Sequence, residues 1–132
     1  GIFTYDTQTF MLEYSGSHNP IYIIRNGELL TYKSNFYPVG VSMENENNIQ
    51  QFANNALLLM ENDKLYIYSD GYIDQFGGRE RKKFMSKRFK ELLLSVASLP
   101  CKEQLEKIEQ TFLVWKGTGP QIDDVLVLGV RI

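Results

Sequence analysis

The sequence contains very little of two residue types that often carry chemistry, cysteine and histidine. Cys101 is the only cysteine and His18 the only histidine among the 132 residues. A single cysteine excludes an intrachain disulfide, and a reducing, cytoplasmic compartment fits this composition. Because Cys101 follows Pro100 in an expected turn and lies far from His18 in the sequence, we interpret it as an incidental thiol and not as a nucleophile.

The sequence also lacks an excess of charge of one sign and lacks long hydrophobic runs. Its 14 Lys and Arg residues against 16 Asp and Glu residues give a formal net charge of −2. There is therefore no electrostatic case for nucleic acid or for an anionic membrane. No segment is long and apolar enough to cross a bilayer, and no signal-peptide pattern opens the chain. We expect no nucleic acid and no direct membrane contact, although a longer parent could carry an upstream sensor or membrane region.

A starting methionine and a capping element are absent as well. Gly1 is followed almost directly by strand-like sequence, which indicates a piece excised from a longer protein. The length suffices for one core but not for two. We therefore expect residues 1–132 to form one partial domain, the C-terminal portion of a longer domain.

One local cluster of positive charge stands out from the balanced composition. Such runs usually form the solvated side of an amphipathic helix, and we favour that interpretation. The alternative is a docking patch for an acidic or phosphorylated partner. The members of the cluster are Arg79, Arg81, Lys82, Lys83, Lys87, Arg88 and Lys90.

The first half of the chain has the period of β-strands. A content of 43% hydrophobic and 13% aromatic residues predicts a folded domain. Asn26-Gly27 predicts a tight hairpin between the second and third expected strands, and residues 61–63 are expected to join the fourth and fifth in another. The expected strands are residues 10–14, 21–25, 28–33, 56–60, 64–69 and 125–132. Residues 44–48 are expected to form an exposed loop.

Helical spacing replaces this alternation after Gly71. Pro100 separates two apolar stripes, and Gly117 is placed to end the second helix. We expect the two helices to pack as an antiparallel pair. Strands, then two helices, then one strand predict an α+β architecture with antiparallel sheets. The stripes fall on Met85, Phe89, Leu92, Leu93 and Val96, and on Leu105, Ile108, Phe112 and Trp115.

Two short acidic segments next to expected strands, here called acidic steps, are the main candidates for a functional site. Asp70 follows the apolar run 66–69, and Asp123-Asp124 precedes an apolar run that begins at Val125. A carboxylate beside a core is costly unless it meets a cation or dense hydrogen bonding. Because the two steps lie more than fifty residues apart, we expect folding to bring these carboxylates together to hold hard metal ions.

Four segments resemble motifs of the PPM-type (protein phosphatase 2C-like) serine/threonine phosphatases, in their bacterial SpoIIE/RsbU-like branch. Residues 14–20 resemble the "AGHNP" turn of this branch, and residues 39–41 resemble its "LG-V" step. Residues 68–76 resemble its "TDG" metal motif, and residues 121–125 resemble its closing "DD-T" motif. The order and spacing of these segments make the chain similar to the C-terminal part of such a domain.

The resemblance implies an antiparallel β-sandwich with a flanking antiparallel helix pair and a metal site at one end between the sheets. The implied cofactor is Mn²⁺ or Mg²⁺, dinuclear in the complete domain, with a bridging water as nucleophile. By position, Asp70 and Asp123 are the implied metal ligands. Gly71 and Asp124 are supporting residues, and Asp124 is placed to orient metal-bound water.

The acidic candidates also have purely structural interpretations. Asp70-Gly71 could serve only to reverse the chain after a strand. Asp123 and Asp124 could serve only to discourage edge pairing. In the context of the other motifs we favour ligation.

Three further features have interpretations that do not involve catalysis. For His18 we favour a turn residue hydrogen-bonded to the backbone over a general acid or a ligand. Asp74 is expected to stabilise the start of the following helix. The stripe of Tyr66, Tyr68 and Tyr72 is expected to pack in the core and at its rim.

The chain departs from the family because it lacks the N-terminal portion with the "DGHG"-like turn, whose Asp bridges the metals. Asp6, the only acid near the start, does not match that motif. We therefore expect the parent to be a metal-dependent phosphatase and this chain alone to be inactive, with a low-affinity metal site. The substrate implied by analogy is a phosphorylated regulatory protein, such as an anti-sigma-factor antagonist. The uncovered sheet surface predicts self-association.

Two other functions compete with this hypothesis. The first is a non-catalytic, phosphatase-like module that binds partners without turnover. The second is a small carboxylate-metal hydrolase unrelated to the family. The second would need all its acid ligands within these residues, and the sequence offers too few well-placed candidates.

Overall fold

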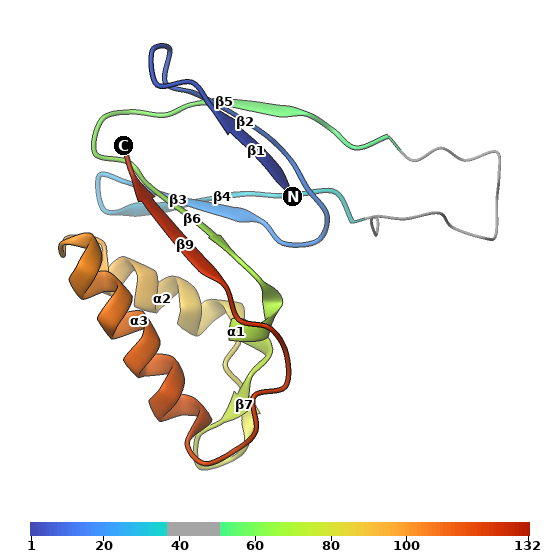
Figure 1. The fold of residues 1–132 in the computed structure, drawn as a ribbon, viewed down its shortest axis with the longest axis vertical. Helices are drawn as coiled ribbons and strands as arrows, with labels where there is room; N and C mark the ends of the chain where they lie inside the picture. Colours follow the sequence, from blue (N-terminus) through green and yellow to red (C-terminus); the bar gives the residue numbers. More distant parts are fainter. Residues whose placement is uncertain (37–50) are drawn as a thin grey trace, which may run out of the picture.

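The computed structural model describes residues 1–36 and 51–132, so the interpretations placed on residues 39–41 and 44–48 lie outside the described residues. Two antiparallel sheets form two layers of the structure (Figure 1). The three-stranded sheet has the order β1 (Ile2–Tyr5), β2 (Met11–Ser15), β5 (Asn55–Leu58). The four-stranded sheet has the order β4 (Glu28–Tyr32), β3 (Ile21–Arg25), β6 (Lys64–Tyr68), β9 (Val127–Arg131).

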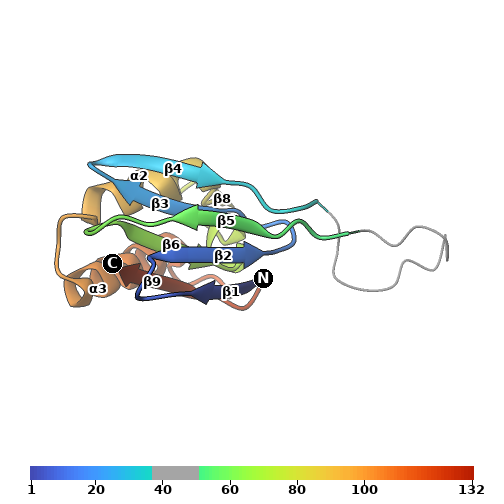
Figure 2. The same ribbon diagram turned by 90° about the horizontal axis from the view of Figure 1, so that it is seen from above.

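Three helices and a short hairpin complete the described part of the chain. The helices are α1 (Asp70–Asp74), α2 (Ser86–Val96) and α3 (Cys101–Lys116), and the hairpin pairs β7 (Phe76–Gly77) with β8 (Lys82–Lys83). Figure 1 shows α2 and α3 on the outer face of the four-stranded sheet, and Figure 2 shows the three-stranded sheet lying over its other face. The predicted α+β fold with antiparallel sheets and a flanking helix pair is confirmed.

Strand β3 contributes side chains to two hydrophobic cores, one on each face of the four-stranded sheet. Ile21 and Ile23 pack between the sheets, whereas Tyr22 and Ile24 pack toward the helices. Because successive side chains of a strand point to opposite faces, a strand covered on both sides reads as a continuous apolar run. All four side chains are at most 1% exposed.

The helix-side core is rich in aromatic rings. Tyr66, Tyr68 and Tyr72 are buried as predicted, and burial raises the pKa of each hydroxyl, that of Tyr66 to about 12. Their hydroxyls are hydrogen-bonded, that of Tyr72 to the carbonyl of Ile108 at 2.8 Å. The helices thus dock on the sheet through rings whose polar ends are satisfied. Within the described residues, no helix has the length and apolar character needed to cross a membrane.

The predicted turns are confirmed in two places and wrong in a third. Asn26 and Gly27 both have positive φ angles, 52° and 83°, as a tight β3–β4 hairpin requires. Gly117 ends α3 with a φ of 57°, and its N–H donates to the carbonyl of Leu113. The second hairpin was expected between residues 56–60 and 64–69, but β5 pairs with β2 and β6 pairs with β3 and β9. The connecting turn crosses from one sheet to the other.

A buried carboxylate in this crossing turn ties the two sheets together. Asp63 is 1% exposed and accepts three hydrogen bonds from the Arg25 guanidinium, two from Nε and one from Nη2 at 2.6 Å. The N–H of Met60 donates to the same carboxylate at 2.8 Å. Burial raises the pKa of Asp63, but these bonds and the charge of Arg25 outweigh it and hold the pKa below its usual value.

The basic cluster does not form one helical face, so the favoured interpretation is wrong for four of its seven members. Arg79, Arg81, Lys82 and Lys83 lie in the β7–β8 hairpin, and only the later members lie on α2. Asp74 does not stabilise the start of a following helix. It is the last residue of α1 and forms an ion pair with Lys83 at 2.9 Å.

Replacing Asp63 by Asn is expected to lower the free energy of unfolding by about 3 kcal/mol, because it leaves the Arg25 guanidinium without its charge partner. Urea denaturation of Asp63→Asn measures this loss. Because the pKa of Asp63 is lowered by folding, its contribution is present above the usual Asp pKa of about 3.9 and is lost as the pH falls through the folded-state pKa. Glu61→Gln, an exposed change in the same turn, is the control; equal stability of the two variants would contradict the prediction.

Candidate metal centre

The register of β6 and β9 brings the two acidic steps together. Tyr68 pairs with Val127 in an antiparallel ladder. The segment that leaves β6 therefore lies beside the segment that enters β9. The first carries Asp70 and the second carries Asp123-Asp124, so these two segments meet at one end of the four-stranded sheet.

Ser69 joins the two segments through its hydroxyl group. Its Oγ donates to the carbonyl of Asp124 at 2.8 Å and accepts from the N–H of Leu126 at 2.8 Å. The Ser69 N–H also donates to the carbonyl of Leu126 at 3.0 Å. These three bonds extend the β6–β9 pairing past the end of the ladder, up to the acidic residues.

Gly71 permits this close approach because it has no side chain. A Cβ atom at this position would lie 2.3 Å from the carbonyl oxygen of Asp124 and 2.9 Å from its carbonyl carbon. Both are backbone atoms, which cannot turn aside as a flexible side chain can. The supporting role assigned to Gly71 therefore has a physical basis that the Asp-Gly turn alone did not indicate.

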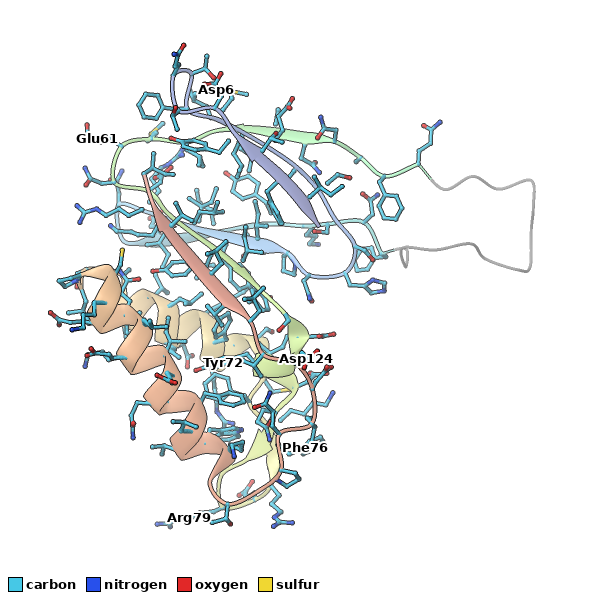
Figure 3. The ribbon with its side chains drawn as sticks, viewed as in Figure 1. Asp6, Glu61, Tyr72, Phe76, Arg79 and Asp124 are labelled. Carbon is cyan, nitrogen blue, oxygen red and sulfur yellow. The ribbon has the colours of Figure 1, made fainter. Side chains whose placement is uncertain are left out.

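The carboxylates themselves face solvent. Asp70, Asp123 and Asp124 are all exposed. Asp70 opens the short helix α1. One oxygen of Asp123 accepts the N–H of Asp124 at 2.7 Å, which orients this carboxylate. Figure 3 shows Asp124 beside the turn that α1 begins, at the end of the sheet away from Glu61.

A second set of hydrogen bonds, made by Gln75, fixes the loop before Asp123 to the turn after α1. The buried side chain of Gln75 donates from Nε2 to the carbonyls of Pro120 at 2.9 Å and Phe76 at 3.0 Å. The indole N–H of Trp115 donates to the carbonyl of Gln75 at 2.9 Å. The end of α3, the turn after α1 and the loop that carries Asp123 are thereby fixed to one another.

His18 lies in a separate hollow of about 350 Å³, with Tyr68, Ile73 and Lys90 among the residues that line it. Its φ of 62° is unusual for a residue other than glycine. Its backbone N–H donates to the carbonyl of Asn35 at 2.8 Å, so this turn residue is hydrogen-bonded to the backbone as expected, and its Nδ1 also lies 2.6 Å from the Ser17 hydroxyl.

The residues at the meeting point fit part of a site for a hard divalent cation. Exposed carboxylate oxygens are the ligands that Mn²⁺ and Mg²⁺ prefer. Asp70 and Asp123 remain our prediction for the ligands, with Asp124 beside them. Within the described residues, however, no group of three or more His, Cys, Asp or Glu side chains is placed to hold a metal ion. A complete centre would need ligands beyond those that these two segments supply.

Two antiparallel sheets with a flanking helix pair form the fold of protein phosphatase 2C-like domains, as the comparisons with known proteins show. The model of the family described as "Stage II sporulation protein E (SpoIIE)" matches residues 2–132. The chain therefore belongs to this family. Among curated proteins, none matches the chain.

Solved structures agree with this assignment. The SiaA-PP2C domain of Pseudomonas aeruginosa is 27% identical with a TM-score of 0.84, and the match covers 96% of this chain and 48% of that domain. The phosphatase domain of the cell fate determinant SpoIIE from Bacillus subtilis is 20% identical with a TM-score of 0.67, covering 99% and 55%. The structure of the RsbU and RsbW domains of Rv1364c from Mycobacterium tuberculosis is 20% identical with a TM-score of 0.70, covering 98% and 34%. The chain thus spans about half the length of the first two of these, and less of the third.

Sequence reasoning missed Ser69 and Gln75. A hydroxyl residue directly before Asp-Gly, at the end of a buried strand, was the available signal for Ser69. No local signal indicated Gln75, because its partner Pro120 lies 45 residues away.

Replacing Ser69 by Ala is expected to weaken Mn²⁺ binding by about tenfold, because a residue that orients metal ligands typically contributes about 10- to 100-fold to affinity. Calorimetric titration of the complete domain that contains this chain measures the change. Ser69→Thr keeps the hydroxyl and is expected to retain the affinity. Ser95→Ala removes an exposed helix hydroxyl bonded to the carbonyl of Leu92 and serves as the matched control. Unchanged affinity in Ser69→Ala would exclude this role.

Proposed function

We propose that the domain to which this chain belongs hydrolyses phosphoserine or phosphothreonine on a protein, in a metal-dependent reaction. The observation that carries the proposal is the meeting of the Asp70 turn with the Asp123-Asp124 segment through the β6–β9 register. Membership of the SpoIIE family and the likeness to PP2C-type domains support it. A fold alone would not, since one fold can host several functions.

The implied cofactor is Mn²⁺ or Mg²⁺. When bound, such ions supply a water of lowered pKa and stabilise the charge that develops on the phosphoryl oxygens. In this chain Asp70 and Asp123 would hold the ion, and Asp124 would orient water bound to it. Ser69 and Gly71 set the distance between the two segments, and Gln75 restrains the loop before Asp123.

The substrate that we propose is a small phosphorylated regulatory protein in a cytoplasmic bacterial signalling system, such as an anti-sigma-factor antagonist. Support comes from the family and from the SpoIIE and RsbU domains among the structural relatives. An exposed pair of acidic segments suits a bulky protein substrate better than an enclosed pocket would, because the phosphorylated residue remains attached to a folded surface.

The complete domain is expected to hydrolyse a phosphoserine peptide when Mn²⁺ is present, and Asp70→Asn or Asp123→Asn is expected to reduce the rate by at least 100-fold. Each variant removes a ligand charge while keeping the shape of the side chain. Phosphate release measures the rate, and residues 1–132 alone are expected to be inactive with weak Mn²⁺ binding.

Asp6→Asn is the matched control for these variants. Asp6 is exposed, accepts the N–H of Gln8 at 2.8 Å, and lies at the end of the molecule away from Asp124 in Figure 3. It is expected to leave the rate unchanged. No activity in a folded complete domain would contradict the proposal and favour a phosphatase-like binding module.

We also propose that residues 1–132 self-associate when separated from the rest of the domain. The edge strand β9 exposes Leu128 to 49% and Val130 to 38%. Unpaired strand edges with apolar side chains promote association.

Light scattering at increasing concentration is expected to give a mass above that of a monomer. Leu128→Lys with Val130→Lys is expected to return the mass to that of a monomer, because charge on an edge strand opposes pairing. Ser98→Lys with Gln110→Lys, at exposed positions outside the strands, adds the same two positive charges and is expected to leave the association unchanged. A monomer at all concentrations would contradict the proposal.

A further inference from the structure

A hollow of about 640 Å³ lies between the β7–β8 hairpin, the end of α3 and the loop that follows α3. Ile122 lines this hollow, and the next residue along the chain is Asp123 of the candidate metal centre. In the view of Figure 3, Phe76 lies between Asp124 and Arg79, along the same side of the molecule. The hollow is therefore near enough in the chain to the candidate metal centre for a bound protein segment to contact both.

The walls of the hollow are held firmly together. The N–H of Gly78 donates to the carbonyl of Trp115 at 2.9 Å. A Cβ at Gly77 would overlap the same carbonyl, so the hairpin contacts α3 backbone to backbone. The guanidinium of Arg88 lies 4.4 Å from the centre of the Trp115 ring on α3. A surface built in this way is preformed for a ligand.

The charged side chains that line the hollow are all positive. Arg79, Arg81 and Lys116 line it, and no acidic residue is among the residues that do. In the described part of the chain, no ion pair involves Arg79 or Arg81. Glu80 lies between these two arginines but is paired with Lys82. The Lys116 ammonium donates to the carbonyl of Gly119 at 3.3 Å, which uses one of its three donors.

Apolar side chains lie exposed in the same hollow. Phe76 is 46% exposed, Ile122 50% and Val114 69%. Apolar contacts surrounded by charges of one sign favour a partner segment that carries the opposite charge together with an apolar anchor.

We propose that this hollow is a docking site for an acidic segment of the protein substrate, next to the phosphorylated residue. Arg79 and Arg81 bind carboxylates of that segment, and the exposed apolar side chains receive a neighbouring apolar residue. The inference rests on the proposed phosphatase function. It assigns substrate selection to the hairpin and leaves the chemistry to the acidic segments.

The test compares two phosphoserine peptides with the complete domain. The peptides are identical except that the residues flanking phosphoserine are Asp and Glu in one and Asn and Gln in the other. The acidic peptide is expected to have a KM about fivefold to tenfold lower, the size expected of two or three partly screened charge pairs. The difference should shrink as salt rises.

Arg79→Glu with Arg81→Glu is expected to abolish this preference without changing kcat or the hydrolysis of para-nitrophenyl phosphate, which has no flanking segment. Arg79→Gln with Arg81→Gln is expected to reduce it in part. Lys87→Glu with Lys107→Glu makes the same change in net charge at exposed positions that do not line the hollow, and is expected to keep the preference. Equal KM values for both peptides, or a loss of preference that is the same in the control variant, would overturn the inference.

Binding of fluorescently labelled peptides with unphosphorylated serine separates this inference from the phosphatase activity. If the domain hydrolyses no substrate, including para-nitrophenyl phosphate, the proposed function fails. Anisotropy still decides the docking site: tighter binding of the acidic peptide that Arg79→Glu with Arg81→Glu removes supports it, and equal binding of both peptides overturns it.

Discussion

The antiparallel pairing of β6 with β9 is the constraint on which the rest of the structure depends. It places the C-terminal strand against a central strand of the four-stranded sheet, with Tyr68 opposite Val127. A slip of one residue would turn the side chains of β9 to the opposite face. It would also shift the carbonyl of Asp124 away from the Ser69 hydroxyl that it meets at 2.8 Å. The helix-side core and the candidate metal centre therefore require the same register.

The sequence predicted those elements whose cause lies in a short stretch of chain. Asn26-Gly27 alone predicts a tight hairpin, because such a turn needs a positive φ at both central residues and Asn and Gly adopt it readily. The apolar stripes predicted both helices, because a period near 3.6 indicates one buried face. Two members were wrong: Met85 precedes α2 and is exposed, and Leu105 is exposed while its neighbour Gln104 is buried.

The acidic steps were singled out because a carboxylate beside an apolar run is costly to bury without a partner, but Asp70, Asp123 and Asp124 are all exposed, so that cost does not arise. The meeting of their segments was expected from these steps and from the family resemblance, and the register of β6 and β9 supplies its physical basis.

Other features depend on partners that are distant in the sequence, and for that reason local patterns did not indicate them. Residues 61–63 look like a hairpin turn, but the partner of Asp63 is Arg25, 38 residues away, and this ion pair belongs to a crossing between sheets. The sequence pattern assigned the basic residues of the β7–β8 hairpin to a helical face. The hairpin forms where Trp115 contacts Gly77 and Gly78, and a local pattern does not indicate that contact. Glycines that appear to be simple turn residues are required here because another backbone approaches them closely.

The fold positions the carboxylates of the candidate metal centre without burying them. Asp70, Asp123 and Asp124 remain exposed, so folding does not have to strip them of water. Their positions are set instead by uncharged groups, the Ser69 hydroxyl and the backbone contact at Gly71. Carboxylates on neighbouring exposed segments repel one another only weakly, because water screens their charges. Among residues 1–36 and 51–132, which the structure describes, no group of three or more His, Cys, Asp or Glu side chains is placed to hold a metal ion. Because hard divalent cations take about six oxygen ligands, a metal held at this end of the sheet would require oxygen ligands from outside these two segments.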